Sequence, residues 1–465
     1  MKKFTKIIVC LLLCVFSLGF VACDDDERTP EEKAFTYPSS SEAVYGNGGL
    51  AVQKGNYLYY VNGYKTVDSD AHTQDGTYTH GALMLMKLNN DGSVVTDENG
   101  LLKDEYYITM SNRLCGFNVT SLYIAGDYLY FTTPSKENTT ENSVDPVWAK
   151  DYVEFYRIKL DKSSEPERIY QAGVLYSNVS FEYYGNGNDV VILVHEKGEN
   201  ISDKAKLEKE DIEEDDVKNN ALIRVTGSGE VSLVKNKVEN YIFADNSDEI
   251  FYITNEDDEY KMYQYNIINN TSSLYVSEDS NFTVDFVSAG NVYRTFNGHL
   301  EVSKISTKSA FEVACYTTST YTKVLVEEGV VVAVWEKSIN LFNSDLRINK
   351  TFTDEANINV IGCVDGVLVY YVDGSDGEKI IKSFSINNFL LNVNETAKVL
   401  GTVKDLDTTY FDLQGDFVYF YATVGSNPYL HRVKVANNTE ECVEMVGVYL
   451  EEDKPEVKTE EEIEE

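Results

Sequence analysis

The residues best suited to metal chemistry lie in one polar segment between Asn62 and Gly81. Within thirteen residues this segment contains three aspartates and two histidines: Asp68, Asp70, His72, Asp75 and His80. Carboxylates and imidazoles are common ligands of divalent cations. The spacing matches neither an EF-hand loop nor a His-Glu-x-x-His motif, so we interpret the segment as a polar surface loop and predict no metal site. We keep His72 and His80 as candidates for ligand binding.

The chain has no motif for nucleophilic catalysis or phosphate binding. It contains no Gly-x-Ser-x-Gly sequence, its five histidines show no triad context, and it has no glycine-rich phosphate loop. Paired carboxylates for glycoside hydrolysis are uninformative here, because 77 acidic residues make some close pairs inevitable. We therefore predict no catalytic residue and no cofactor. A carbohydrate-active enzyme is the alternative to a binding protein.

Aromatic residues offer a second kind of candidate site. Trp148 lies in the polar segment from Pro134 to Lys150, and we select it as a candidate ligand-binding residue. The 34 tyrosines recur at strand positions, so we assign most of them to the core and a few to a rim that stacks on a sugar or peptide. The segment from Asp373 to Glu378 has the composition of a calcium loop, but we interpret it as a hairpin turn.

The charge of the chain excludes several classes of partner. There are 77 acidic against 40 basic residues, which gives a formal net charge of −37. Such acidity argues against binding to nucleic acid or to anionic lipid, because both are polyanions. The 43% of hydrophobic residues is enough for a folded core.

The first 23 residues predict where the protein resides. Lysines at the start are followed by an apolar run from Ile7 to Val21, which is shorter than the roughly 20 residues of a membrane-spanning helix. The run ends in Phe20-Val21-Ala22-Cys23, which resembles the lipobox of a bacterial lipoprotein signal peptide. The resemblance implies cleavage before Cys23, lipidation of its thiol, and an acyl anchor on the extracytoplasmic face of a bacterial membrane. The alternative is an ordinary secretory signal.

We expect four segments after this assignment: a signal peptide over 1–22, an acidic tether over 23–47, a β-propeller over 48–450 and an acidic tail over 451–465. Apart from Cys23, the mature chain contains four cysteines at wide spacing, which gives no metal motif. We interpret them as free thiols buried in strands, with a disulfide as the alternative in an oxidising compartment. They are Cys115, Cys315, Cys363 and Cys442.

The body of the chain repeats one unit. A turn containing Gly, Asn or Asp is followed each time by a run of β-branched and aromatic residues, which favours a strand. The eight copies begin near residues 55, 126, 187, 247, 290, 329, 366 and 415. Flanking runs bring each unit to about four strands, and a period of about 50 residues is typical of a β-propeller. We predict an all-β propeller with eight blades. The alternatives are seven blades, stacked β-sandwiches or an open β-solenoid.

A family resemblance follows from two of these strands. A Gly-Asp/Asn-hydrophobic-Tyr-Tyr/Phe strand paired with a Leu/Tyr-x-Arg/Lys-Ile/Val-x-Leu strand resembles the bacterial extracellular lipoprotein propellers. These in turn are similar to the YWTD propellers and to the TolB/WD40-like group. The resemblance spans nearly all of residues 48–448, although no full Tyr-Trp-Thr-Asp motif is present. It implies a propeller that serves mostly as a binding platform.

Three insertions interrupt the repeat, at residues 62–81, 134–150 and 198–220. The third includes a stretch from Ser202 to Glu214 that predicts a capped, charged helix. All three fall between the second and third strands of consecutive units, so we expect them on one face of the ring, where repeat proteins often bind ligands. The predicted function is therefore a lipid-anchored extracytoplasmic binding module for an envelope protein, peptide or glycan.

Overall fold

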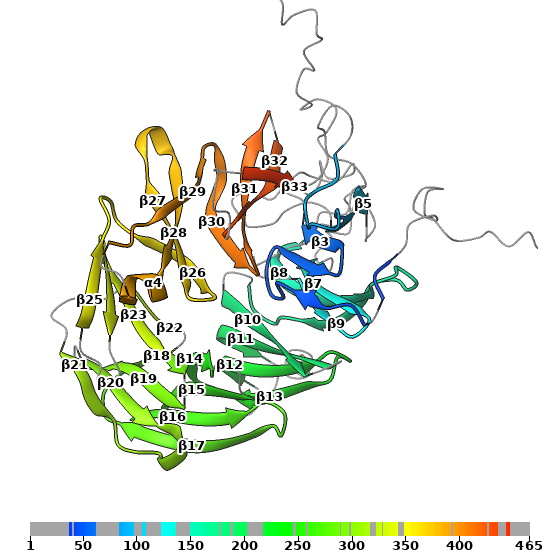
Figure 1. Ribbon diagram of the computed structural model, residues 1–465. Helices are drawn as coiled ribbons and strands as arrows, with labels where there is room; N and C mark the ends of the chain where they lie inside the picture. The colour runs from blue at the N-terminus through cyan, green and yellow to red at the C-terminus, as the bar shows by residue number, and fades with distance from the viewer. Residues whose placement is uncertain are drawn as a thin grey trace, which may run out of the picture. The chain divides into compact units, whose positions relative to one another are not determined.

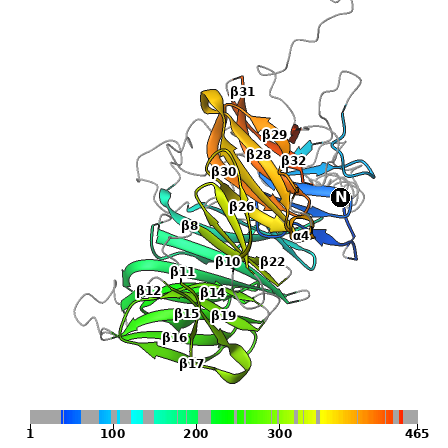
Figure 2. The ribbon, with the colours of Figure 1, turned by 60° about the vertical axis from the view of Figure 1, so that its left-hand side comes forward.

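The computed structural model (Figure 1) describes the residues from Tyr37 to Val446 with gaps, and residues from Pro38 onwards form one unit. Strands dominate this unit, and the blades follow each other around a ring in chain order (Figures 1 and 2). The described ranges are 37–39, 41–61, 83–96, 105–107, 122–135, 149–175, 178–186, 189–201, 217–244, 248–256, 259–288, 290–296, 299–316, 322–327, 329–342, 348–391, 394–425, 427–435 and 443–446.

The strands form eight antiparallel sheets, and neighbours within each sheet are also neighbours in the chain. We number these sheets as blades 1 to 8. Blade 1 has an additional short first strand. The first four blades consist of β1 (Val44–Tyr45), β2 (Ala51–Lys54), β3 (Tyr57–Val61), β4 (Leu83–Lys87) and β5 (Glu105–Tyr107); β6 (Tyr123–Ala125), β7 (Tyr128–Ser135), β8 (Ala149–Lys159) and β9 (Glu167–Gln171); β10 (Val179–Asn186), β11 (Asp189–Ile201), β12 (Val217–Thr226) and β13 (Val231–Lys235); and β14 (Val238–Phe243), β15 (Glu249–Glu256), β16 (Glu259–Asn266) and β17 (Thr271–Glu278).

Blades 5 to 8 repeat the same four-stranded order. Helical segments among the described residues are short: η4 (Ile305–Thr307), η5 (Ser375–Gly377) and α4 (Ile386–Leu391). The strands of these blades are β18 (Thr283–Ser288), β19 (Asn291–Phe296), β20 (His299–Lys304) and β21 (Glu312–Tyr316); β22 (Lys323–Glu327), β23 (Val330–Trp335), β24 (Ser338–Phe342) and β25 (Ile348–Thr353); β26 (Asn359–Val364), β27 (Val367–Asp373), β28 (Lys379–Ser385) and β29 (Lys398–Val403); and β30 (Leu406–Gln414), β31 (Phe417–Val424), β32 (Asn427–Lys434) and β33 (Val443–Val446).

The predicted eight-bladed, all-β propeller is confirmed, and each predicted repeat start lies between the first and second strands of a blade, where the strands of blade 1 are counted from β2. The turn in blade 7 shows why: Asp365 and Gly366 have φ of 48° and 73°, the left-handed geometry of tight hairpin turns. The second strand then lies inside the blade, where neighbouring blades cover both of its faces. All five residues of β3 are buried, which explains why its sequence is apolar throughout.

The interior is rich in tyrosine, as the sequence predicts. The hydroxyl groups of these tyrosines pair within or across blades, as buried phenols require. Tyr59 of blade 1 donates to the carbonyl of Leu160 in blade 2 at 3.1 Å. The fully buried tyrosines are Tyr59, Tyr60, Tyr252, Tyr265, Tyr370, Tyr421 and Tyr429.

The ring closes between blade 8 and blade 1, and each of these two blades is built from its own end of the chain. The Tyr421 hydroxyl donates to the carbonyl of Val61 at 2.8 Å, across 360 residues of sequence. The amide of Leu50 donates to the Asp412 carboxylate at 2.7 Å. An apolar cluster that includes Leu58 and Leu430 packs along the same seam. Side chains and backbone amides therefore close the ring without a shared strand among the described residues.

A β-bulge recurs in the fourth strand of blades 2 to 7. At each bulge the pairing with the third strand skips one residue of the fourth strand. Where the side chain is described it turns inward: Ile169 and Leu400 are buried in the clusters between blades. The skipped residues are Ile169, Val234, Tyr275, Ala314, Asn349 and Leu400.

The three insertions connect the second and third strands of blades 1, 2 and 3, as predicted. The charged helix predicted from Ser202 lies outside the described residues, and Val217 already begins β12. The segment from Asp373 to Glu378 is a hairpin turn, as interpreted: η5 lies in it and the amide of Gly374 donates to the Glu378 carbonyl at 2.9 Å.

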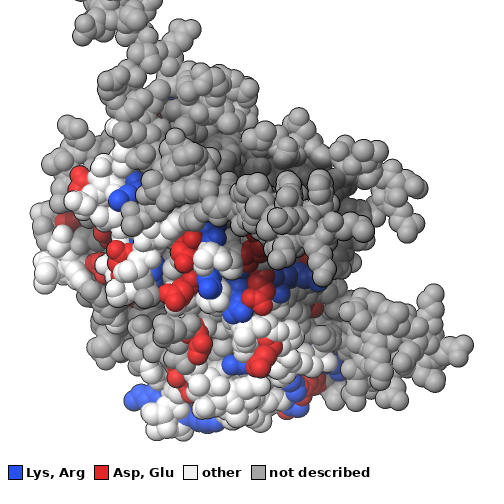
Figure 3. Space-filling view, turned by 90° about the vertical axis from the view of Figure 1, so that its right-hand side faces the viewer, with Lys and Arg blue, Asp and Glu red and all other residues white. Residues whose placement is uncertain are grey.

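The structure describes part of the charged surface and two of the four cysteines that follow Cys23. Acidic and basic side chains are interspersed over the face displayed in Figure 3. Cys363 is half-buried in β26, and Cys315 lies in β21. Cys115 and Cys442 lie outside the described residues. No helix in the described ranges is both long and apolar enough to cross a membrane.

Candidate functional site

The residues singled out from the sequence lie outside the described residues. This holds for Cys23, His72, His80 and Trp148. The three insertions, two of which contain His72, His80 and Trp148, leave the blades at the end opposite to the turns between first and second strands. This follows because neighbouring strands are antiparallel. The role predicted for the insertions therefore stays a prediction.

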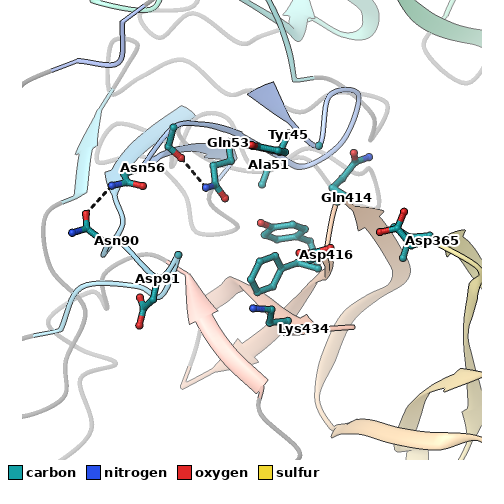
Figure 4. A pocket seen from close by; sticks show the side chains of 17 residues that line it. Tyr45, Ala51, Gln53, Asn56, Asn90, Asp91, Asp365, Gln414, Asp416 and Lys434 are labelled. Atoms are coloured by element: carbon teal, nitrogen blue, oxygen red, sulfur yellow. Dashed lines mark hydrogen bonds between the residues drawn. The ribbon is translucent and has the colours of Figure 1, made fainter. Parts of the chain in front are cut away.

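A hollow that could hold a ligand lies at the opposite ends of the blades, on the turn face. We call it the seam pocket, because it lies where blade 8 meets blade 1 and it also contacts the turn of blade 7 (Figure 4). Its volume is about 660 Å³, within the range of roughly 300–1,000 Å³ typical of small-molecule sites. It is lined mainly by Tyr45, Gln53, Asn56, Asn90, Asp91, Asp365, Gln414, Asp416, Phe417, Tyr419 and Lys434.

A buried arginine holds the seam pocket together. Arg432, in the third strand of blade 8, is fully buried, and its Nε donates to Glu444 at 2.6 Å. Its Nη2 donates to the carbonyl of Gly92 in blade 1 at 2.7 Å, and its guanidinium lies 4.2 Å from the ring centroid of Phe417. One side chain thus fixes a lining ring and a lining turn from two different blades.

The same arrangement joins blades 2 and 3. The Nε of Arg157 donates to Glu167 at 2.8 Å, and its Nη1 donates to the carbonyl of Gly227 at 2.8 Å. Its guanidinium lies 4.7 Å from the Tyr128 ring centroid. Arg157 and Arg432 pair with equivalent tyrosines of their second strands, Tyr130 and Tyr419. We call this set of contacts an arginine latch. In the sequence it is indicated only by an arginine that recurs in the third strand.

Three amide side chains present hydrogen-bonding groups to the seam pocket. Gln53 donates to the Gly55 carbonyl at 2.8 Å, Asn56 donates to Asn90 at 3.0 Å, and Gln414 donates to Asp412 at 3.0 Å. These bonds orient the amides, and Figure 4 shows the first two of them as dashed lines. All three amides line the pocket, and none of the described residues donates a hydrogen bond to their side-chain oxygens, which are thus available as acceptors.

The charges of the seam pocket are unbalanced. Asp91, Asp365 and Asp416 line it together with a single cation, Lys434. The hydroxyl and amide of Ser93 donate to the Asp91 carboxylate, and these hydrogen bonds lower the pKa of Asp91 below its ordinary value. The pocket is therefore net negative at neutral pH and disfavours anionic ligands.

Asp412 anchors the seam from inside the ring. It lies in β30, is buried, and accepts hydrogen bonds from the Leu50 amide and from Gln414. Burial raises the pKa of the Asp412 carboxyl above its ordinary value. Gly49 lies against it so closely that a Cβ at this position would overlap the Asp412 and Gln414 side chains. The glycine is required by this close approach.

Two carboxyl groups among the described residues have a raised pKa, and they lie in different blades. Desolvation raises the pKa of Glu182, in the inner strand β10 of blade 3, to about 7. Glu182 is nonetheless exposed to solvent, which weakens this desolvation. The other is Asp412 in blade 8. This distribution does not favour the carbohydrate-active enzyme. Within the described ranges, no three His, Cys, Asp or Glu side chains form a group suited to a metal ion.

A further hollow lies on the insertion face, at the inner ends of blades 6 to 8. Its volume is about 580 Å³ and its lining includes Lys323, Tyr371 and Phe411. The rings of Tyr371 and Phe411 pack on each other with centroids 4.9 Å apart. Because these two rings pack against each other, part of the aromatic surface of this hollow is covered by protein.

The lining of the seam pocket was hidden in turns that the sequence marks only as hairpins. Gly55-Asn56 and Gly415-Asp416 begin the first and last repeats, and the repeat alignment gave them a structural role. The signal that would have found the site is ring closure itself, since it brings the first and last repeats together.

Comparisons with known proteins give no family for this chain. No family model matches the sequence, and no curated protein matches it. A prolyl endopeptidase shares 10% identity over 89% of this chain and 61% of its own length, with a TM-score of 0.47. A chain of a nidogen–laminin complex shares 7% identity over 68% of this chain and 96% of its own, with a TM-score of 0.29. The computationally designed protein Ika8 shares 10% identity over 74% and 98%, with a TM-score of 0.34. This chain thus spans about three-fifths of the endopeptidase chain, and these similarities assign it no family.

Proposed function

We propose that the protein is a lipid-anchored, extracytoplasmic binding module whose propeller holds a neutral glycan in the seam pocket. One observation supports a neutral glycan as the ligand. Three amide side chains, oriented by hydrogen bonds and with available oxygens, line a pocket whose net charge is negative. Amide groups match the donors and acceptors of sugar hydroxyls, whereas the three aspartates oppose an acidic ligand.

An exposed aromatic ring completes this chemistry. Tyr45 lines the seam pocket and is 57% exposed, so its ring face is open to a partner. An aromatic face packs well on the C–H face of a sugar ring. Phe417 is less available, because the guanidinium of Arg432 already lies against it.

The location follows from the lipobox-like sequence ending at Cys23. An acyl anchor would keep the propeller at the membrane surface, where envelope glycans are at hand. The acidic segments that flank the propeller favour solvation over contact with an anionic bilayer.

Binding to an array of neutral and acidic glycans tests the proposal. We expect the full-length protein to retain neutral glycans, and Tyr45→Ala to weaken this binding about three- to tenfold through loss of stacking. Trp335→Ala is the matched control, since Trp335 is a 40% exposed aromatic residue at the other end of a blade. Capture of proteins or peptides only, or equal effects of the two substitutions, would contradict the assignment.

A further inference from the structure

A second hollow on the turn face has the opposite chemistry. It lies over blade 3 and touches blades 2 and 4, and its volume is about 430 Å³. We call it the arginine pocket. Its polar lining includes Tyr128, Arg157, Asp189, Arg224, Thr226 and Ser228.

Two arginines in one pocket are unusual in this chain. The sequence contains eight arginines and carries a net charge of −37. At physiological ionic strength the Debye length is about 8 Å, so the distant acids are largely screened and the local guanidinium groups determine which ion binds.

The two arginines differ in how many of their donors are used. Arg157 is the latch between blades 2 and 3: it is paired with Glu167 and with the Gly227 carbonyl. Arg224 donates from Nε to the carbonyl of Ile267 in blade 4 at 3.1 Å. No described residue accepts a hydrogen bond from its Nη1 or Nη2. Arg224 is therefore held in place by one bond while its terminal donors stay open to the pocket.

We propose that the open fork of Arg224 binds the carboxylate group of a small ligand in the arginine pocket. Nη1 and Nη2 form a planar pair of donors whose spacing matches the two oxygens of a carboxylate. The lining holds the two guanidinium groups of Arg157 and Arg224 against the carboxylate of Asp189, a net charge of +1 that favours one negative charge over two. A phosphate dianion would leave this pocket with a net negative charge beside Asp189.

The arginine pocket is separate from the seam pocket, so this inference does not depend on the glycan assignment. Its proposed ligand is an anion, which the net negative seam pocket disfavours. The two pockets nevertheless share one construction, a latch arginine on an aromatic ring that reaches the turn of the next blade.

A titration of the full-length protein followed by ligand-observed NMR tests the inference. The probes are glucuronate, as a sugar acid, and N-acetyl-dialanine, as a peptide carboxylate, each beside its neutral methyl ester or amide. We expect at least one acid to bind saturably and its neutral derivative to bind at least about tenfold more weakly. The acid that binds more tightly identifies the source of the carboxylate.

Three substitutions locate the binding. Arg224→Gln is expected to weaken the acid about tenfold or more, and Arg224→Lys, which keeps the charge without the fork, to weaken it less. Asp189→Asn is expected to tighten binding about two- to fivefold, because it removes a like charge. Lys404→Gln, at an exposed lysine that lines neither pocket, is the control and is expected to leave acid binding unchanged.

The inference is overturned if neither acid binds, if the neutral derivatives bind equally well, or if Arg224→Gln retains the affinity of the unmodified protein. Circular dichroism of each variant confirms that the strands are intact. If Arg224→Gln does not fold, the comparison of Arg224→Lys, Asp189→Asn and the neutral derivatives decides the outcome in the same way.

Discussion

The arginine latch at the seam predicts an unequal response to two chemically identical substitutions. Arg432→Ala removes a fully buried guanidinium, leaves the Gly92 carbonyl without its donor, and leaves Glu444, 26% exposed in its side chain, with only the Val94 amide. Loss of one partner from a buried ion pair typically costs about 3–5 kcal/mol. Arg157→Ala removes the same contacts from blades 2 and 3, but Arg157 and Glu167 are 19% and 56% exposed in their side chains.

Water compensates the more exposed latch. Exposed ion pairs contribute about 0–1 kcal/mol, and the bond to the Gly227 carbonyl adds about 1 kcal/mol. We therefore expect Arg157→Ala to lower the free energy of unfolding by about 1–2 kcal/mol, which is less than half the effect of Arg432→Ala. The difference comes from burial, since each arginine pairs with a glutamate, a carbonyl of the next blade and an aromatic ring.

Urea unfolding followed by tryptophan fluorescence and circular dichroism measures both variants. Hydrogen exchange adds a local readout, because loss of Arg432 is expected to increase exchange near Gly92 in blade 1, on the far side of the seam. Equal destabilisation of the two variants, or a loss below about 1 kcal/mol for Arg432→Ala, would refute the reasoning from burial.

Three further predictions test other parts of the molecule. Gly49→Ala places a Cβ only 2.6 Å from Gln414 Cγ and against Asp412, so we expect a loss of about 1–3 kcal/mol in urea unfolding; unchanged stability would contradict the close approach. The pKa of Glu182 is raised from 4.5 to about 7, so the folded state binds more protons in this window and stability falls as the pH rises through it. Glu182→Gln removes part of this loss, and its stability relative to the unmodified protein should rise between pH 4.5 and pH 7; a constant difference would contradict the assignment. Cys23→Ala should abolish metabolic labelling with palmitate, and continued labelling would exclude the lipid anchor.

Much of the architecture follows from local sequence. A turn residue followed by an apolar, aromatic run marks the first hairpin of every blade, and the eight marks predict eight blades. The continuous apolar character of β3 also predicts its burial on both faces. The bulges in the fourth strands were not predicted, because a skipped residue leaves no trace in the alternation of so short a strand.

The binding sites depend on contacts that cross the ring. Arg432 occupies the position of the recurring arginine in the third strand. The carbonyl that accepts its hydrogen bond belongs to Gly92, which is 340 residues away in the sequence. Likewise, Asp412 and Leu50 are separated by 362 residues. Neither pair shares a local pattern that a reading along the chain detects.

The sequence by itself determined the repeat, the all-β class, the acidity and the lipobox-like start, because each depends on residue type and short spacing. Only the tertiary structure decided where the pockets lie, which donors stay open and which arginines are latches. Closing the ring places the first repeat beside the last and turns hairpin residues into the lining of a site. The ring closes because each blade packs against the next, and the sequence of a single repeat does not encode this packing.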